Sequence, residues 1–443
     1  MYRTRLGVIL CFISIISCSS PTIEKQKTIG GNERDELRSF CSTKDGGFIL
    51  GGWSYSQKSG EKTTYNNGIF YPDYWIIKFD KKGEIQWQKS IGGTNLDYLK
   101  SIANTHDGGY IIAGESASDS SGEKSQNCRG SVDIWTMKID STGNIQWDKT
   151  YGGSGTELCG AVKQAADGGY IIVGASNSDI SGDKTGSCRG DFDLWVLKLD
   201  SLGKKEWDKS IGGNGYEFCW DFEFTQDEGM MLCAYSSSDK SGEKTENNRG
   251  TQSDIWIIKL DRYGNIVWDK TIGGKEDDYC HAIKRTNDGD YIVAAVSKSN
   301  IGYEKSQNSK GGLDFWMLKL DESGNKIWDK TIGGNGNEKE LPGLNITEDG
   351  GYIIGGTSNS NSSGDKTDSC RGNYDFWVVK LDKDGNVNWD KTIGGNNYDE
   401  LKSIEEIEKD HFLITGFTKS DKSGDKKDSS RGMEDFWIVY MND

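Results

Sequence analysis

Apolar and polar positions alternate along the chain in short runs that glycine-rich turns separate. Residues 97–153 contain four such runs of strand length, at 99–105, 110–115, 133–140 and 145–151. Turns with Asp and Gly follow the first run and the third, and such turns supply the backbone positions that join antiparallel strands. No apolar run has helical spacing, so the pattern predicts an all-β chain with four strands in each unit.

The third strand of each unit carries an Asp-x-Trp motif, which defines the period of a repeat. Its tryptophans recur every 60 or 61 residues, as Trp75, Trp135, Trp195, Trp256, Trp316, Trp377 and Trp437. In the sixth copy, Phe376 to Leu381 place apolar side chains on both faces of the strand, so both faces must be covered. Four-stranded sheets stacked face to face around an axis meet this need, and we predict a seven-bladed β-propeller.

The two ends of the repeat region complement each other. The repeats begin with Lys27–Gly31, which matches the end of a fourth strand, and they finish with Asp435–Met441, a third strand. We expect the N-terminal strand to complete the last blade and close the ring, which removes unpaired sheet edges. An open solenoid is the alternative. With closure, the N-terminal strand starts at the face of the short turns, opposite the long loops.

The first residues are predicted to be a processing signal. Two arginines precede an apolar run, residues 8–16, that is too short to span a bilayer as a mature helix. A small residue and Cys18 follow, which resembles a bacterial lipobox. The resemblance implies a signal peptide (1–17), a tether (18–25) with lipidated Cys18, and an outer-membrane lipoprotein with its propeller at 26–443. An ordinary secretory signal with an incidental Cys is the alternative.

The acidic composition changes the range of partners. The formal net charge is −16, and nucleic-acid binding needs a basic surface, so we exclude nucleic acid as a partner. An acidic chain remains compatible with an exported domain and with cation binding.

The complete repeat unit resembles that of a known group of proteins. It reads Asp-Gly-Gly-Tyr-Ile-Ile, Asp-x-Trp-x-x-Lys-Leu-Asp-x-x-Gly-Asn-x-x-Trp and Lys-(Thr/Ser)-x-Gly-Gly, over residues 27–443. Such repeats are similar to those of secreted or lipid-anchored proteins of Bacteroidetes-type bacteria. The resemblance implies export and a propeller-like body, and it implies no established activity.

A shorter stretch, residues 140–147, resembles the docking turn of quinoprotein-type propellers. There the Trp packs on a glycine of a neighbouring blade, and no quinone cofactor is implied. The resemblance predicts this structural role for Trp87, Trp147, Trp207, Trp268, Trp328 and Trp389, with Lys25 in the N-terminal copy.

An acid stands four positions after every Gly-Gly pair: Asp35, Asp97, Glu157, Glu217, Asp278, Glu338 and Asp399. On loops at the channel mouth, such a ring would hold a cation such as Ca²⁺, or a basic group of a partner. The alternative is a repeated ion pair with the base of each long loop, for example Arg129, since unpaired carboxylates would repel one another. The Ser-Gly-(Asp/Glu)-Lys stretches of these loops are interpreted as self-capped turns.

Residues that break the repeat are better candidates for one specific site. The lengthened loop of the first blade is aromatic, and Tyr303 is a second departure from the repeat. We expect binding of a protein or a sugar by Trp53, Tyr55, Tyr65, Phe70, Tyr71 and Tyr303. Packing of the loop on itself is the alternative.

Export also permits disulfides, and equivalent positions suggest Cys128–Cys159 and Cys188–Cys219, with Cys159–Cys188 as the alternative. The three histidines have no metal-ligand spacing, and no Gly-x-Ser-x-Gly occurs. We therefore expect a non-catalytic propeller, without a metal or cofactor, that binds a protein or glycan through its long-loop face. The alternatives are a carbohydrate-active, hydrolase-like enzyme that uses channel-mouth carboxylates, and a structural envelope scaffold.

Overall fold

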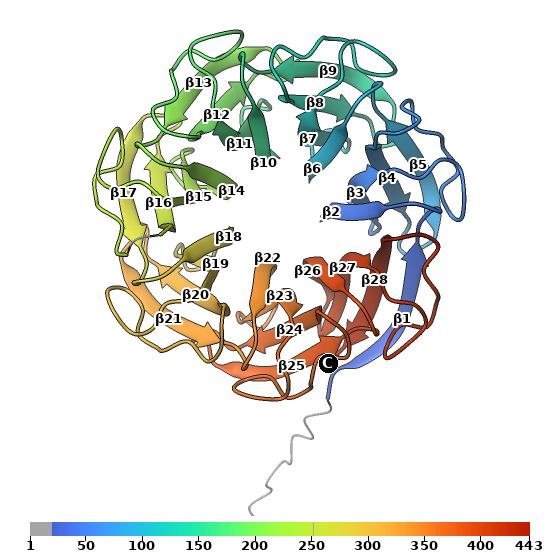
Figure 1. The fold of residues 1–443 in the computed structure, drawn as a ribbon, viewed down its shortest axis with the longest axis vertical. Coiled ribbons are helices and arrows are strands. Elements are labelled where there is room, and N and C mark those ends of the chain that lie inside the picture. Colours follow the sequence, from blue (N-terminus) through green and yellow to red (C-terminus); the bar gives the residue numbers. More distant parts are fainter. Residues whose placement is uncertain (1–19, 251) are drawn as a thin grey trace, which may run out of the picture.

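The protein forms seven four-stranded antiparallel sheets around a central channel (Figure 1). The computed structural model describes residues 20–250 and 252–443, and every regular element within these ranges is a strand. Each sheet is one blade, which confirms the predicted seven-bladed β-propeller. We number the blades one to seven in the chain order of their innermost strands.

The four strands of a blade follow one another from the channel outward. The innermost strands are β2 (Asp35–Ser42), β6 (Asp97–Asn104), β10 (Glu157–Gln164), β14 (Glu217–Phe224), β18 (Asp278–Arg285), β22 (Glu338–Ile346) and β26 (Asp399–Glu408). The second strands are β3 (Phe48–Ser54), β7 (Tyr110–Ser116), β11 (Tyr170–Ser176), β15 (Met230–Ser236), β19 (Tyr291–Ser297), β23 (Tyr352–Ser358) and β27 (His411–Thr418). The third strands are β4 (Asp73–Phe79), β8 (Asp133–Ile139), β12 (Asp193–Leu199), β16 (Asp254–Leu260), β20 (Asp314–Leu320), β24 (Asp375–Leu381) and β28 (Asp435–Asn442). The outermost strands are β5 (Ile85–Ile91), β9 (Ile145–Tyr151), β13 (Lys205–Ile211), β17 (Ile266–Ile272), β21 (Lys326–Ile332), β25 (Val387–Ile393) and, in blade seven, β1 (Thr22–Ile29).

The N-terminal strand closes the ring. β1 pairs antiparallel with β28, with Thr22 opposite Asn442 and Ile29 opposite Phe436. The predicted closure is therefore confirmed. Because β1 begins at Thr22, residues 22–25 belong to the last blade, although the sequence analysis assigned them to the tether. Cys18 and the predicted signal peptide lie outside the described residues.

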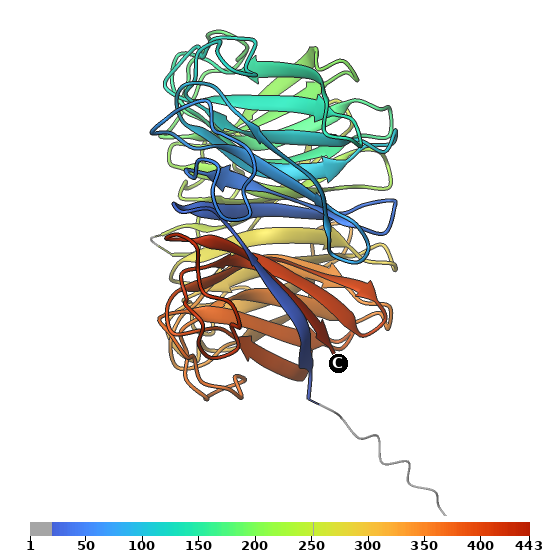
Figure 2. The same ribbon diagram turned by 90° about the vertical axis from the view of Figure 1, so that its right-hand side faces the viewer.

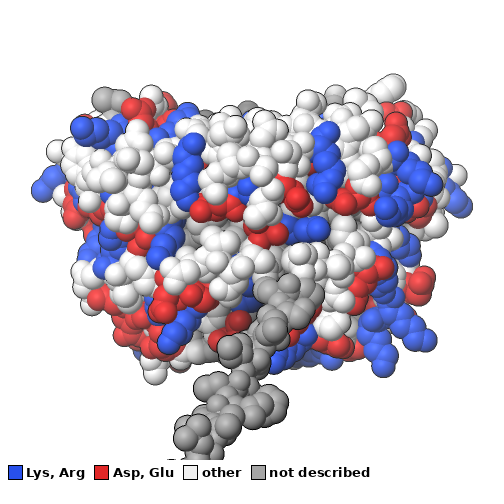
Figure 3. Space-filling view, turned by 90° about the horizontal axis from the view of Figure 1, so that it is seen from below, with Lys and Arg blue, Asp and Glu red and all other residues white. Residues whose placement is uncertain are grey.

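Thr22 marks the face at which the chain enters the propeller. It lies beside the C-terminal end of β28, at the face that carries the short hairpin turns, and the long loops occupy the opposite face (Figure 2). In residues 20–250 and 252–443, no helix has the length and apolarity needed to cross a membrane. Acidic and basic side chains are interspersed over the side of the ring seen in Figure 3.

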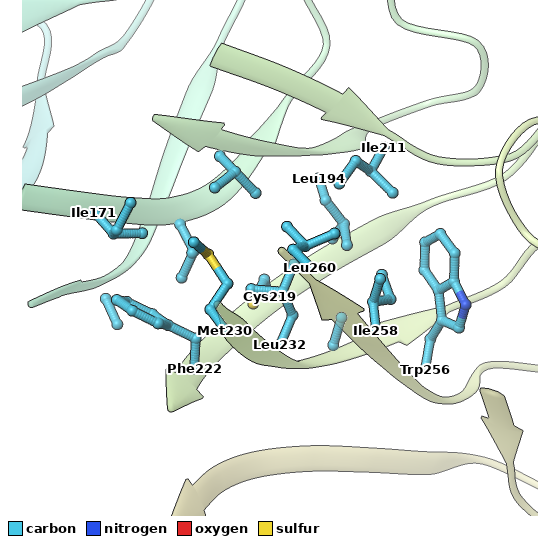
Figure 4. Close-up of a cluster of buried hydrophobic side chains, with 14 residues drawn as sticks. Ile171, Leu194, Ile211, Cys219, Phe222, Met230, Leu232, Trp256, Ile258 and Leu260 are labelled. Atoms are coloured by element: carbon cyan, nitrogen blue, oxygen red, sulfur yellow. The ribbon is translucent and has the colours of Figure 1, made fainter. Parts of the chain in front are cut away.

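The hydrophobic core is divided into layers that lie between adjacent blades. Between blades three and four, Ile171 and Leu194 face Phe222 and Leu232, and Trp256 lies at one end of the same cluster (Figure 4). All seven Asp-x-Trp indoles are 0% exposed. Burial of one large side chain contributes ~1.5–3 kcal/mol, so these layers hold each blade to the next.

The predicted docking role of the outer-strand tryptophans is also seen. Trp147 donates its Nε1–H to the carbonyl of Ser201 in the next blade, at 3.3 Å. In the N-terminal copy, Lys25 takes this place and donates to the carbonyl of Lys82 at 3.0 Å. These contacts tie the rim of the ring together on the outside of the core.

Candidate functional site

The seven acids after the Gly-Gly pairs are buried rather than displayed at a channel mouth. Each of them, from Asp35 to Asp399, is 0% exposed. In blade two, the Asp97 carboxylate accepts hydrogen bonds from the backbone N–H of Gly93 (2.7 Å) and the hydroxyl of Ser118 (3.0 Å). The prediction of an accessible cation-binding ring is therefore wrong. The hydrogen bonds of each acid close the turn between two blades, which explains why the acid repeats with the fold.

Each ring acid also meets the Asp of the preceding Asp-x-Trp motif, so the blade junctions contain paired carboxyl groups. At the first junction, Oδ1 of Asp73 and Oδ1 of Asp97 are both buried without a hydrogen-bond partner among the described residues. Burial first, and the Asp97 charge in addition, raise the pKa of Asp73 to about 7. Burial raises the pKa of Asp97 to about 6. Two buried carboxylates repel, so the pair retains a proton near neutral pH.

The bases of the long loops do not pair with the ring acids either, so the alternative ion pair is also wrong. The Arg129 guanidinium contacts the Asp183 carboxylate at 3.1 Å, and Asp183 belongs to the Ser-Gly-Asp-Lys turn of the following blade. Arg431 contacts Glu61 at 2.8 Å and so joins blade seven to blade one. The acid of each turn therefore binds the neighbouring blade.

The lysine of each Ser-Gly-(Asp/Glu)-Lys turn is buried. Lys124 is 2% exposed, and its Nζ donates to the Thr150 hydroxyl (2.8 Å) and the Gln126 carbonyl (2.6 Å). The backbone of the turn closes on itself through Lys124 N–H and the Ser121 carbonyl at 2.9 Å. This matches the interpretation as a self-closed turn. Within the described ranges, no cluster of three or more His, Cys, Asp or Glu is arranged to hold a metal ion.

The cysteines within the described residues are free thiols, and the predicted disulfides do not form. Cys128 and Cys188 lie in long loops, where each thiol faces a backbone carbonyl at 3.4 Å. Cys159 and Cys219 are buried in innermost strands, in the core layers between blades. Each thiol packs where a small apolar side chain would fit, so the shared positions reflect the repeated core.

The aromatic residues of blade one divide into a packed pair, of which Trp53 is buried and Tyr55 half-buried, and an exposed group. Trp53 is 4% exposed, with the Tyr98 ring 5.1 Å away and the Arg34 guanidinium 4.8 Å from its centre. The Tyr55 hydroxyl lies 3.2 Å from that of Tyr98. For Trp53 and Tyr55, packing within the fold therefore accounts for the aromatic character.

The tip of the same loop leaves its apolar side chains in solvent. The exposed fractions are 68% for Tyr65, 78% for Ile69, 81% for Phe70 and 42% for Tyr71. We call these four residues the blade-one tip. Tyr303 is also exposed, at 63%, but it belongs to blade five on another part of the ring, so it does not join this group.

The central channel contains a second set of non-repeating residues, and sequence reasoning missed it. In every blade, the pairing of the innermost strand with the second strand shifts at the same position. Such a bulge leaves a residue unpaired and re-aims its side chain. All of the bulge residues line one cavity of about 550 Å³: Arg38, Lys100, Gly160, Trp220, His281, Pro342 and Lys402. We call this cavity the channel cavity.

Blade six departs most from the regular bulge. β22 has nine residues, against eight in β18, and Glu340 is the inserted one, with a φ of 45° that non-glycine residues rarely adopt. Its carboxylate lies 2.6 Å from Nζ of Lys402, which also contacts Glu400. Backbone strain of this kind gathers at functional positions, so the insertion marks the channel cavity as a site.

Aromatic groups line the wall of the channel cavity formed by blades four and five. Trp220 is 38% exposed, and its ring lies 5.8 Å from that of His281, inclined by 32°. Burial lowers the pKa of His281 to about 4, so the imidazole is neutral at pH 7. A comparison of the repeats position by position would have found these residues, because the bulge position holds basic, aromatic, glycine and proline residues in different copies.

Comparisons with known proteins identify the fold alone. No model of a known protein family matches the sequence, and no curated protein does. A chain of the hydrazine synthase of Kuenenia stuttgartiensis is similar in structure, with a TM-score of 0.52 and 10% identity over 86% of this chain and 93% of that chain. A protein of unknown function from Dyadobacter fermentans has a TM-score of 0.49 at 8% identity, over 96% of this chain and 99% of that one.

Proposed function

We propose that this protein is a non-catalytic interaction module of the bacterial cell envelope that binds a protein partner through its long-loop face. Propellers commonly mediate protein interaction, and the fold supports this class of function. The observation that carries the proposal is the blade-one tip, where four large apolar side chains are exposed on one loop. The other long loops, over the residues that the structure describes, expose at most two, such as Ile301 and Tyr303.

The blade-one tip has the properties of a protein-binding hot spot. Phe70 and Ile69 are among the most exposed large apolar side chains of the described residues, at 81% and 78%. The backbone beneath them is held by Asn67, whose side chain donates to the Gly92 carbonyl (3.0 Å) and the Glu123 carboxylate (2.6 Å). Aromatic side chains on an anchored loop lose little conformational entropy when a partner covers them.

The orientation of the propeller supports the same surface. A lipid on Cys18 would hold the chain at the membrane a few residues before Thr22, where β1 begins. Because Thr22 lies at the short-turn face, the long loops would point away from the bilayer. The blade-one tip would then be presented to proteins at a distance from the membrane surface.

The hydrolase alternative depended on ring acids that a substrate can reach. All seven ring acids are buried in hydrogen-bonded blade junctions, and a catalytic acid pair must reach the substrate. The scaffold alternative predicts no binding partner at this surface. The experiment that tests the proposal therefore also tests this alternative.

Site-specific photo-cross-linking tests the proposal. A photoreactive phenylalanine analogue replaces Phe70 in cells that express the full chain, and the matched control carries the analogue at Val267, which is 56% exposed on the outer strand β17. We expect one defined protein adduct from position 70 and none from position 267. Equal patterns from both positions, or no adduct from position 70, would refute the proposal.

Competition distinguishes a specific partner from a sticky surface. Added soluble propeller of residues 20–443 should suppress the adduct, whereas the same protein with Tyr65→Ser and Phe70→Ser should not. Both side chains are exposed, so the double variant should keep the thermal unfolding midpoint of the parent. Equal suppression by the parent and the variant would show that the blade-one tip is not the contact.

A further inference from the structure

The channel cavity differs from the rest of the ring in that a large aromatic side chain is open to it. Trp220 is the only tryptophan at a bulge position, and 38% of it is exposed, whereas the seven Asp-x-Trp indoles are fully buried. The ring of Phe218 packs against it, with 4.7 Å between the ring centres and an inclination of 63°. An aromatic face that is fixed in place but uncovered is a platform for a flat ligand.

We propose that the channel cavity binds the pyranose ring of an uncharged sugar, with the C–H face of the ring stacked on Trp220 and its hydroxyls held by the ion pairs of the channel wall. This site is separate from the blade-one tip and does not depend on the function proposed for it.

The size and position of the cavity fit such a ligand. Its volume of about 550 Å³ lies in the range of small-molecule sites, roughly 300–1,000 Å³. It is lined by the second halves of the innermost strands, such as Ile102–Asn104 of β6 and Val162–Gln164 of β10. These halves lead to the short-turn face, so the cavity lies toward the face opposite the long loops.

The neighbouring blade leaves room beside the indole. Blade three carries Gly160 at its bulge position, and a methyl group on its α-carbon would come within 2.0 Å of the Cys219 carbonyl oxygen. The two innermost strands are therefore in close contact here, and the bulge position of blade three presents no side chain to the cavity. His281 of blade five extends the aromatic surface on the other side, at 5.8 Å between ring centres.

The polar wall includes three ion pairs, and Lys284 and Glu405 also line the cavity. Lys100 lies 3.2 Å from Glu115, Lys163 lies 3.0 Å from Asp221, and Lys402 lies 2.6 Å from Glu340. Each pair presents ammonium donors next to carboxylate acceptors, which matches hydroxyl groups that both donate and accept.

The same pairing argues against a charged ligand. A charged ligand that bound at one of these three ion pairs would have to break it, and the group left behind would lose its partner in a partly buried wall. A neutral polyol can instead add hydrogen bonds to the pairs as they stand.

The protonation state of the cavity supports an uncharged ligand as well. The charged groups that face His281 are Glu340 and Lys402, and burial keeps the pKa of the imidazole low, at about 4. His281 therefore offers one donor and one acceptor throughout the neutral range. Binding should not change between pH 6 and pH 8.

Saturation-transfer NMR with the propeller of residues 20–443 tests the proposal. The probes are the methyl pyranosides of glucose, galactose and mannose, with glucuronate and benzoate as charged counterparts. We expect at least one pyranoside to receive saturation from the protein, and the transfer should be strongest at its axial ring protons. The affinity should be independent of salt and at least ~10-fold lower in Trp220→Ala.

Two further variants keep the result interpretable. Trp220→Phe retains an aromatic face and should keep part of the binding, and Tyr65→Ala, at the blade-one tip, should keep all of it. Circular dichroism and the unfolding midpoint show that each variant is folded. Three results would overturn the proposal: no pyranoside binds the parent, binding persists in a folded Trp220→Ala, or only the charged probes bind. Loss of partner cross-linking at position 70 would leave this inference intact.

Discussion

The indole of Trp147 in β9 covers the α-carbon of Gly203 in the next blade so closely that no side chain fits between them. A methyl group on Gly203 would lie 2.8 Å from Trp147 Cζ3, and the backbone there has a φ of +76°. Gly168 has a similar φ, +84°, but nothing within 4 Å. These two glycines separate the cost of the backbone conformation from the cost of the inter-blade contact.

We predict that Gly203→Ala is more destabilising than Gly168→Ala. The left-handed backbone costs alanine ~1–2 kcal/mol at both positions, and the forced displacement of Trp147 adds ~1–3 kcal/mol at Gly203 only. Denaturant unfolding of the two variants measures the difference. Equal losses would mean that the outer tryptophans do not hold the blades together.

The stability of the propeller should increase on acidification from pH 7 to about pH 4.5. Eight junction carboxyls have a folded-state pKa above that of an unfolded chain: about 6 for Asp35, Asp97, Asp133, Asp278 and Asp375, and about 7 for Asp73, Asp254 and Glu338. The folded state then binds more protons than the unfolded state between pH 4 and 7, so the free energy of unfolding falls as pH rises through that window.

Above pH 8 the change of the free energy of unfolding with pH reverses its sign, because buried lysines titrate in that range. The folded-state pKa is lowered to about 8 in Lys62, Lys244, Lys305 and Lys366. Between pH 8 and about pH 9 the unfolded state binds more protons, so stability should increase again. At higher pH the buried cysteines oppose this gain, because burial raises the pKa of thiols such as Cys159 and Cys219 in the folded state. Thermal unfolding should therefore show a minimum near pH 7–8, and a maximum in that range would contradict both assignments.

Asp73→Asn tests the carboxyl pairs directly. An asparagine amide always carries N–H groups that can donate a hydrogen bond. The Asp73 carboxyl can donate a hydrogen bond to Asp97 only while it is protonated. We expect the variant to be at least as stable as the parent at pH 8 and to lose part of the acid-induced stabilisation. A variant that is strongly destabilised at pH 8 would show that Asp73 is needed as a charge.

Deletion of residues 22–29 should open the ring. The deletion exposes the edge of β28 and removes Gln26, whose side-chain oxygen accepts hydrogen bonds from Trp437 Nε1 (3.2 Å) and Lys427 N–H (3.1 Å). Unpaired edges aggregate, so we expect soluble aggregates in size-exclusion chromatography and a large loss of stability. Gln26→Leu removes only these two hydrogen bonds and a third, from Gln26 Nε2 to the Asp425 carbonyl at 2.6 Å, and should cost ~1–3 kcal/mol. A monomeric deletion variant with unchanged stability would contradict the closure.

The inserted Glu340 should combine a favourable ion pair with a strained backbone. Glu340→Ala removes one of the two carboxylates that contact Lys402 and keeps the backbone strain, whereas Glu340→Gly removes both this carboxylate and the strain. We therefore predict that both variants are less stable than the parent. The free energy of unfolding of the glycine variant should be ~1 kcal/mol higher than that of the alanine variant. Denaturant unfolding decides the order, and a more stable alanine variant would refute the strain.

The repeat made the fold predictable in detail. Asp-x-Trp at a 60-residue period, strands that are apolar on both faces and complementary ends are local patterns, and each has one solution that buries its side chains and pairs its edges. The seven blades, the closure by β1 and the docking of Trp147 on the next blade were accordingly inferred without coordinates.

The candidate sites were less predictable, because the sequence pattern of a repeated polar residue does not show whether its side chain is exposed or buried. The sequence predicts Asp97 and its equivalents in loops near the channel. In the structure they begin the innermost strands, and hydroxyl groups and glycine N–H groups of the packed blades surround them. The loop base was expected to pair with a ring acid, but Arg129 contacts Asp183 in the loop of the following blade instead.

The sequence by itself determined the number of blades, the order of strands and the point of closure, since these depend on periodicity and on contacts within one repeat. Only the tertiary structure decided which side chains meet across blades and which face the channel. Trp220, His281 and Glu340 are far apart along the chain, and they meet at one cavity because each innermost strand bulges, with one further residue inserted in blade six. Bulges arise from how two strands fit together in space, so no single stretch of sequence encodes that convergence.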